Sequence, residues 1–192
     1  MPRVGVLALQ GDVREHVSML EGIGADVVTV RVAGQFEGLS GLVLPGGEST
    51  TIARLLDTSG MRPMLEEKLR DGMSVFGTCA GLILLSREVL DGRSDQWSFG
   101  LLDVSVRRNG YGRQIASFES PVDVEGVGTV PGVFIRAPKI ETWSSDVEVL
   151  ASHDHGDGFH PVLVRQGNAW GCSFHPELTS DARVHQLFVD SL

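Results

Sequence analysis

The first half of the chain alternates short apolar runs with amphipathic segments. The apolar runs are typical of strands that are buried on both faces of a sheet. Apolar side chains recur at helical spacing between them, which predicts helices. The expected strands cover residues 3–9, 27–32, 41–44 and 73–76. The first expected helix begins after Asp12, which forms a capping box with Glu15, and the second begins near Ser49 or Thr50. Two more helices are expected over residues 61–71 and 80–90. Such alternation requires right-handed crossovers, so we predict a doubly wound, mostly parallel α/β sheet with helices on both faces.

The second half changes to short β-rich runs, some of them spaced as hairpins. These runs are expected to add antiparallel strands to the fold, and a last amphipathic helix is expected over residues 180–190. The runs cover residues 101–106, 114–118, 133–136, 147–151, 161–166 and 169–174. The sequence contains no internal repeat, low-complexity tract or linker, so we expect a single domain over residues 1–192.

Composition excludes several classes of protein. The chain has 192 residues, of which 42% are hydrophobic, and 16 Lys and Arg against 25 Asp and Glu give a net charge of −9. This charge repels a phosphate backbone, which argues against nucleic-acid binding. No apolar run approaches the roughly 20 residues of a membrane span, and the N-terminal pattern is not that of a secretory signal, so a cytoplasmic location is expected. Two cysteines are too few for a disulfide framework, and they lack the close pairing of a structural zinc site.

Cys79 lies in the sequence Gly77-Thr78-Cys79-Ala80-Gly81, between a predicted strand and a predicted helix. This is a cysteine version of the G-x-S-x-G turn, which projects a nucleophile from a sharp strand-to-helix bend. A thiol at a helix N-terminus is near the positive end of the helix dipole, which favours the thiolate. The alternative is a small buried residue in a tight turn. The glycines and the strand-helix context favour a nucleophile, whereas Cys172, inside a predicted strand, is interpreted as core packing.

His175-Pro176-Glu177 directly follows the last predicted strand. An imidazole held by a carboxylate is what a thiol nucleophile needs as its base, although the same residues would also suit an ordinary surface loop.

Pro45-Gly46-Gly47 closes the predicted strand 41–44. Two adjacent glycines let the backbone present N–H groups to a ligand, as in an oxyanion hole, or they simply meet the need of a turn for positive φ. Ligands of open α/β sheets bind outside the carboxyl ends of the strands. We therefore expect this turn, Cys79 and His175 to meet in one crevice.

Other candidate sites have less support. The stretch His153-Asp154-His155-Gly156-Asp157 has the residue types of a metal site, but it falls in a predicted hairpin turn and is better explained as a solvated loop. No metal site is expected. The sequence has no G-x-G-x-x-G or Walker motif, so a nucleotide site has no support either.

These motifs resemble the class I (triad) glutamine amidotransferases, and within them the glutaminase subunits of pyridoxal 5′-phosphate synthases. The resemblance covers nearly the whole chain and is weakest at residues 87–100 and 152–160. The triad motifs are shared by other glutaminases, and additional stretches carry the narrower resemblance. These are Leu9-Gln10-Gly11, Arg14-Glu15-His16, residues 46–51, residues 108–114, Phe134-Ile135-Arg136-Ala137-Pro138 and residues 175–179.

The resemblance implies hydrolysis of L-glutamine to glutamate and ammonia, without a cofactor. In such enzymes the ammonia passes to a synthase subunit, which builds pyridoxal 5′-phosphate. Cys79 is then the nucleophile, His175 the base and acid, and Glu177 its orienting partner. The glutamine contacts of the family map onto Gly47, Glu48, Ser49, Arg108, Ile135 and Arg136.

Three further assignments accompany the resemblance. The backbone N–H groups of Gly47 and Ala80 are the candidates for the oxyanion hole. Arg108 and Arg136 offer fixed positive charge to a substrate carboxylate, although surface salt bridges would use the same residues. Gln10 and the helix after it match the region that meets the synthase.

Three alternatives stay open at this stage, because a fold and a triad do not fix a function. The chain could be a catalytically silent binding subunit, a glutaminase that serves another ammonia-using synthase, or a thiol hydrolase or peptidase of related fold.

Overall fold

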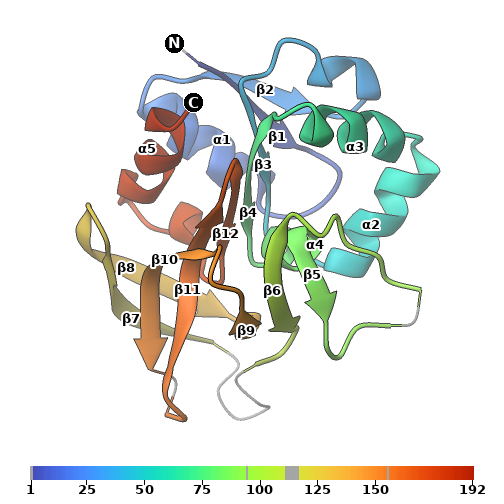
Figure 1. Cartoon of the computed structure of the whole chain (residues 1–192). Helices are drawn as coiled ribbons and strands as arrows, with labels where there is room; N and C mark the ends of the chain where they lie inside the picture. Colours follow the sequence, from blue (N-terminus) through green and yellow to red (C-terminus); the bar gives the residue numbers. More distant parts are fainter. Residues whose placement is uncertain (1, 94, 111–116, 155) are drawn as a thin grey trace.

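A seven-stranded sheet forms the centre of the computed structural model, which describes residues 2–93, 95–110, 117–154 and 156–192 (Figure 1). Its strand order is β10-β11-β12-β4-β3-β1-β2. Parallel pairing joins β1, β2, β3, β4 and β12, while β11 pairs antiparallel with both β10 and β12 and is the one strand of this sheet that runs in the opposite direction. The strands are β1 (Arg3–Leu7), β2 (Asp26–Val30), β3 (Gly41–Leu44), β4 (Ser74–Thr78), β10 (Glu148–Asp154), β11 (Phe159–Gln166) and β12 (Ala169–Cys172). The predicted α/β class with added antiparallel strands is confirmed.

Helices cover both faces of this sheet, as the alternating pattern predicts (Figure 1). On one face, α1 (Val13–Gly22) and α5 (Arg183–Asp190) pack over a buried cluster that includes Leu20 and Phe188. On the other, α2 (Ser49–Thr58), α3 (Arg62–Arg70) and α4 (Ala80–Leu85) cover a second cluster. Short 3₁₀ turns η1 (Ala33–Phe36) and η2 (Pro176–Leu178) complete the connections. Among the described residues, no helix has the length and apolarity needed to cross a membrane.

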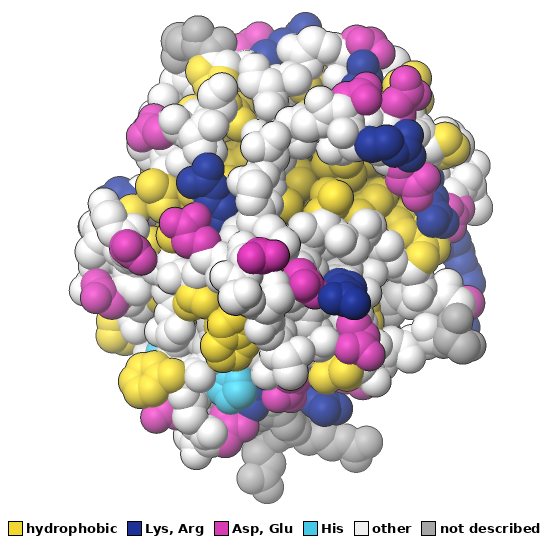
Figure 2. Space-filling model, in the orientation of Figure 1, with side chains coloured by type: hydrophobic (Ala, Val, Ile, Leu, Met, Phe, Trp, Pro, Cys, Tyr) yellow, Lys and Arg dark blue, Asp and Glu magenta, His cyan; other side chains and the backbone are white. Residues whose placement is uncertain are grey.

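Two smaller sheets come from the second half of the chain. One consists of β5 (Ser86–Val89), β6 (Leu102–Arg107) and β9 (Lys139–Trp143), in the order β5-β6-β9. The other is the hairpin of β7 (Ser117–Val124) and β8 (Gly128–Ile135). On the outer surface, acidic and basic side chains are interspersed over the visible face, so that face presents no continuous basic surface (Figure 2).

The structure corrects several predicted boundaries. The helix expected over residues 80–90 ends at Leu85, and residues 86–89 form β5 instead. The sequence reasoning missed β9 and placed the start of β8 at residue 133, five residues after its first residue, Gly128. Part of the predicted strand 114–118, residues 114–116, lies outside the described residues. Strand β5 exists because it pairs with β6, a partner that helical periodicity cannot reveal.

The carboxyl ends of β3, β4 and β12 lie side by side at one edge of the sheet. Leu44 pairs with Gly77, and Thr78 pairs with Cys172, so these three neighbouring strands end at nearly the same level. The chain segments that follow them are the ones that carry the candidate site.

Candidate active site

Cys79 lies at the bend between β4 and α4. Its φ of 49° and ψ of −101° are unusual for a residue with a side chain, and its backbone N–H donates to the carbonyl of Cys172 at 2.8 Å. Close packing makes Gly81 necessary, because a Cβ there would overlap the carbonyl of Leu44. Strain of this kind persists where the surroundings over-determine it, as at functional sites. The side chain is 8% exposed and lines a cleft, so it is accessible to a small molecule.

His175 and Glu177 follow β12 and are both nearly buried. The backbone N–H of His175 donates to the carbonyl of Val133 at 2.8 Å, which fixes the segment against β8. Nδ1 of the imidazole lies 2.7 Å from Oε1 of Glu177. Burial raises the pKa of the Glu177 carboxyl, although the contact with His175 acts to lower it.

The imidazole of His175 favours its protonated form. Burial acts to lower the pKa of His175, but its contacts with the Asp12 and Glu177 carboxylates and the neighbouring Cys79 thiol raise it to about 12. A protonated imidazole beside Cys79 is the partner that a thiolate nucleophile requires.

Asp12 has a different role from the capping residue predicted by its spacing to Glu15. It precedes α1, but its side chain makes no capping hydrogen bond. Instead, Oδ2 lies 3.4 Å from Nδ1 of His175, and its backbone N–H donates to the carbonyl of Gly46 at 3.1 Å. Asp12 thus belongs to the site, although the sequence reasoning missed it. Its position two residues after Gln10 was the available signal.

Asp12, His175 and Glu177 have ligand-type atoms within 4.8 Å of one another, the geometry of a possible cation site. However, Nδ1 of His175 already contacts both carboxylates, which favours a hydrogen-bonded imidazole over a metal ligand. The stretch 153–157 forms no comparable cluster among its described residues, and His155 lies outside them. A hairpin between antiparallel strands is present, as predicted, but His153 and Asp154 belong to the end of β10 rather than to the turn that leads to β11.

The turn after β3 is held against the segment that precedes α1. Gly47 has a φ of +152°, and a Cβ at this position would lie 2.5 Å from Oε1 of Gln10. That same oxygen accepts the backbone N–H of Glu48 at 2.8 Å. Gly46 is packed equally tightly, because its Cβ would lie 2.6 Å from Cε1 of His175. Glycines therefore let this turn approach both Gln10 and the imidazole.

Glu48 caps α2 and binds an arginine from a distant loop. Its carboxylate accepts hydrogen bonds from the backbone N–H groups of Thr50 at 3.2 Å and Thr51 at 2.7 Å, and from Nη2 of Arg108 at 2.8 Å. Burial acts to raise the pKa of Glu48, but the bonds from Thr51 and Thr50 lower it. The neighbouring Ser49 hydroxyl accepts from Nε2 of Gln96 at 2.9 Å.

One cleft of about 410 Å³ collects nearly all the predicted site residues. Glu177 stands behind His175 and does not line the cleft, and Ala80 is the buried first residue of α4. Four residues that line the cleft were missed by the sequence reasoning, namely Asp12, Ile83, Asn109 and Leu178. The predicted residues that line it are Gln10, Gly47, Glu48, Ser49, Cys79, Arg108, Ile135, Arg136 and His175.

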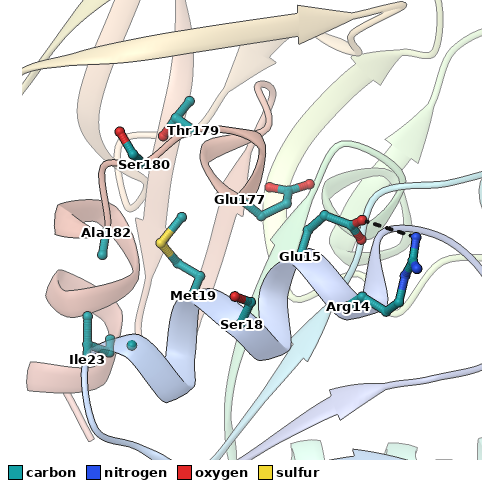
Figure 3. A pocket seen from close by; sticks show the side chains of 10 residues that line it. Arg14, Glu15, Ser18, Met19, Ile23, Glu177, Thr179, Ser180 and Ala182 are labelled. Atoms are coloured by element: carbon teal, nitrogen blue, oxygen red, sulfur yellow. Dashed lines mark ion pairs between the residues drawn. The ribbon is translucent and has the colours of Figure 1, made fainter.

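A larger groove, of about 630 Å³, lies between α1 and the segment 177–182 (Figure 3). Glu177 reaches it from the site, and its other lining includes Arg14, Glu15 and Met19. Cys79 does not line this groove. The smaller cleft is therefore the candidate substrate site, since of the two it is the one that combines the thiol with the imidazole.

Comparisons with a family model and with known proteins agree on the family of this chain. The family model described as "SNO glutamine amidotransferase family" matches residues 6–192. The chain is 54% identical over 190 residues to "Pyridoxal 5′-phosphate synthase subunit PdxT" of Mycobacteroides abscessus, covering 98% of this chain and 96% of the relative. It is 54% identical over 191 residues to the protein of the same name from Streptomyces avermitilis, covering 98% and 93%.

Solved structures with a similar fold support this comparison. A structure described as "Crystal structure of glutamine amidotransferase" superposes with a TM-score of 0.90 at 47% identity, covering 97% of each chain. The structure of PurLQS from Thermotoga maritima has a TM-score of 0.74 at 17% identity, covering 99% of this chain and 98% of that chain, and shares the fold. The family predicted from the motifs is thus confirmed: the chain belongs to the SNO glutamine amidotransferase family.

Proposed function

We propose that this chain hydrolyses L-glutamine to L-glutamate and ammonia, and that the ammonia serves a pyridoxal 5′-phosphate synthase. The observation that carries the proposal is the placement of Cys79 and a proton-holding His175 in one cleft. The relatives named as subunits of pyridoxal 5′-phosphate synthase support the destination of the ammonia. The proposal treats the chain as one glutaminase domain.

The reaction begins with attack of the Cys79 thiolate on the side-chain amide carbon of glutamine. The backbone N–H groups of Gly47 and Ala80 stabilise the negative charge that develops on the amide oxygen. Protonated His175 then gives its proton to the departing nitrogen, so that ammonia leaves and a γ-glutamyl thioester remains. Neutral His175 removes a proton from the water that hydrolyses the thioester, and Glu177 holds the ring by its Nδ1–H throughout.

Substrate recognition uses charges on the cleft wall. Free glutamine carries an ammonium and a carboxylate at the end away from its amide. Arg108 and Arg136 suit the carboxylate, and Glu48, which Arg108 contacts in the free protein, suits the ammonium. Gly47, Ser49 and Ile135 complete the proposed contacts from the surrounding walls.

The synthase subunit is the proposed partner, and Gln10 is the residue that links it to the site. Gln10 bonds the backbone of Glu48, next to the proposed oxyanion donor Gly47. A partner seated on Gln10 and α1 would therefore set the position of that donor. We expect the isolated chain to be slow and the synthase to raise its turnover. A cytoplasmic location agrees with two unpaired thiols, one of them the nucleophile.

Replacement of the nucleophile tests this function. We expect Cys79→Ser to abolish glutamate release in the presence of purified synthase, because a hydroxyl is not activated as a thiol is at this site. Cys172→Ser is the matched control and keeps the activity, since that side chain is buried outside the cleft. Near-normal turnover by Cys79→Ser would contradict the proposal.

The wild-type chain separates the remaining alternatives. A silent binding subunit releases no glutamate from glutamine even with the synthase, and a peptidase prefers peptide amides to free glutamine. A glutaminase for another synthase is not stimulated by pyridoxal 5′-phosphate synthase. The proposal expects stimulated glutamate release together with glutamine-dependent formation of pyridoxal 5′-phosphate.

A further inference from the structure

Two buried histidines contact each other next to the site. His16 lies on α1 and His185 on α5, 169 positions apart in the sequence, and both are completely buried. Nδ1 of His16 is 2.9 Å from Nε2 of His185, and the ring centres are 5.1 Å apart. Neither ring lines the substrate cleft. Buried polar groups are normally paired, so the placement of their protons has structural consequences.

The surroundings decide which nitrogens carry the protons. A hydrogen bond between two imidazole nitrogens needs a proton on one of them. Nδ1 of His185 has no hydrogen-bond partner among the described residues, and a buried N–H without an acceptor is costly. The proton of His185 therefore belongs on Nε2, which donates to Nδ1 of His16. His16 then carries its own proton on Nε2.

The contacts of His16 Nε2 support the same arrangement. This nitrogen lies 3.0 Å from Oγ1 of Thr78 and 3.5 Å from Oε1 of Glu177. A carboxylate oxygen cannot donate, so a lone pair on Nε2 would face it unfavourably, whereas an N–H is attracted to it. The same Oε1 of Glu177 contacts Nδ1 of His175. His16 thus approaches the oxygen that orients the catalytic imidazole.

Both rings are neutral at physiological pH, as this proton count requires. Burial lowers the pKa of His16 well below its usual value, and the nearby His185 and His175 lower it further. Burial also lowers the pKa of His185 to about 4. Each ring therefore keeps one proton, and the direction of the hydrogen-bond chain is fixed from His185 through His16 to Thr78 and Glu177.

We propose that His16 is a positioning residue for glutamine hydrolysis, holding Glu177 and Thr78 through its Nε2–H, while His185 donates to its Nδ1. The inference rests on the proposed function and concerns how its triad is held. Thr78 directly precedes Cys79, so one imidazole contacts the supports of both the nucleophile and the base. Because His16 belongs to α1, a displacement of α1 is transmitted to Glu177, whose side chain is seen close to that helix in Figure 3.

Turnover of three variants tests this role, measured as glutamate release with saturating synthase. His16→Leu removes the N–H, and we expect kcat to fall about 10-fold with little change in KM, the effect of losing one hydrogen bond to a charged group. His16→Gln keeps an N–H donor and an acceptor, and we expect it to retain most of kcat. Leu20→Ala is the matched control, because it removes buried apolar atoms from the same helix without touching the triad.

Two results would overturn the proposal. One is the same kcat in His16→Leu and His16→Gln, and the other is an equal loss of kcat in Leu20→Ala, which would indicate a general effect of weakened α1 packing.

A spectroscopic test does not depend on activity or on the folding of a His16 variant. Long-range ¹H–¹⁵N correlation of the wild-type chain is expected to show His16 as the Nε2–H tautomer, with its Nδ1 accepting a hydrogen bond. An Nδ1–H tautomer of His16 in the wild-type chain would overturn the proposal. Absence of wild-type glutaminase activity would instead count against the proposed function, so the two failures are distinguishable.

Discussion

Asp12 lies 3.4 Å from Nδ1 of His175, measured from its Oδ2 atom, and both residues line the same cleft. The same imidazole nitrogen is 2.7 Å from Glu177, so two carboxylates from distant parts of the chain surround it. Glu177 is buried, whereas the Asp12 side chain is 35% exposed. Asp12 therefore gives the imidazolium form of His175 a second source of stabilisation, one that is open to the cleft.

Removal of this charge is expected to change the pH dependence of the enzyme. The pKa of His175 is raised to about 12, so its charged form stabilises the fold fully below the ordinary value near 6.5. This stabilisation is lost as the pH rises through the folded pKa. Asp12→Asn is expected to lower the His175 pKa, so the alkaline loss of kcat/KM moves to lower pH.

Glu15→Gln is the matched control for Asp12→Asn, because Glu15 lies three residues away, in the first turn of α1, and pairs with Arg14 rather than with His175. The pH profile of kcat/KM and an NMR titration of the His175 ring measure the effect. An unchanged alkaline limb in Asp12→Asn would show that Glu177 and Cys79 alone hold the proton.

The two cysteines are expected to differ sharply in reactivity. Cys79 lines the cleft, whereas Cys172 is completely buried and its thiol donates to the carbonyl of Phe174 at 3.3 Å. Burial raises the pKa of Cys172 well above its ordinary value, and the charge of Glu177 raises it further. A glutamine-like electrophile should therefore label Cys79 and leave Cys172 unmodified, as peptide mass spectrometry would show. Label on Cys172 would mean that its packing opens in solution.

The backbone strain at Cys79 should be visible in stability. Glycine at this positive φ relieves a backbone strain of about 1–3 kcal/mol. The greater conformational entropy that glycine gives the unfolded chain costs about 0.5–1 kcal/mol in return. The free energy of unfolding of Cys79→Gly is thus expected to be about 1 kcal/mol higher than that of Cys79→Ala. Cys172 lies in β12, where the order of the glycine and alanine variants is expected to reverse. Denaturant unfolding checks both pairs, and the same order at both positions would contradict the assignment of strain.

Adjacent arginines offer a matched test of substrate binding. Arg108 lines the cleft, while Arg107 does not and its Nε donates to Oε1 of Glu141 at 3.0 Å. Arg108→Gln should raise KM for glutamine about 10-fold or more, since it removes a charged hydrogen-bond donor, whereas Arg107→Gln should leave KM unchanged. Steady-state glutaminase kinetics with the synthase measure both. Equal KM values would assign Arg108 to the surface salt bridge with Glu48 alone.

Much of the site geometry could be predicted from local patterns. The strand signals before Gly46, Cys79 and His175 are short and apolar, and parallel pairing places their carboxyl ends at one edge. The helix expected over residues 80–90 was wrong in its second half, because β5 depends on pairing with β6. Local periodicity contains no information about that distant partner.

The contacts around the imidazole were harder to predict. Asp12 has the spacing of a capping residue, and only the folded chain brings its side chain to His175. The pair His16 and His185 joins two helices from opposite ends of the sequence, so neither residue signals the other locally. Side-chain partners of this kind are decided by tertiary packing.

Strands β4 and β12 are hydrogen-bonded neighbours, with Thr78 opposite Cys172. Cys79 and His175 follow these two strands, one residue after Thr78 and three residues after Cys172. The strands that carry them are about 4.8 Å apart, a spacing set by backbone geometry. Any partner that tunes the rate must consequently work from the periphery, through the glycine turn or through the helix that carries Asp12 at its start.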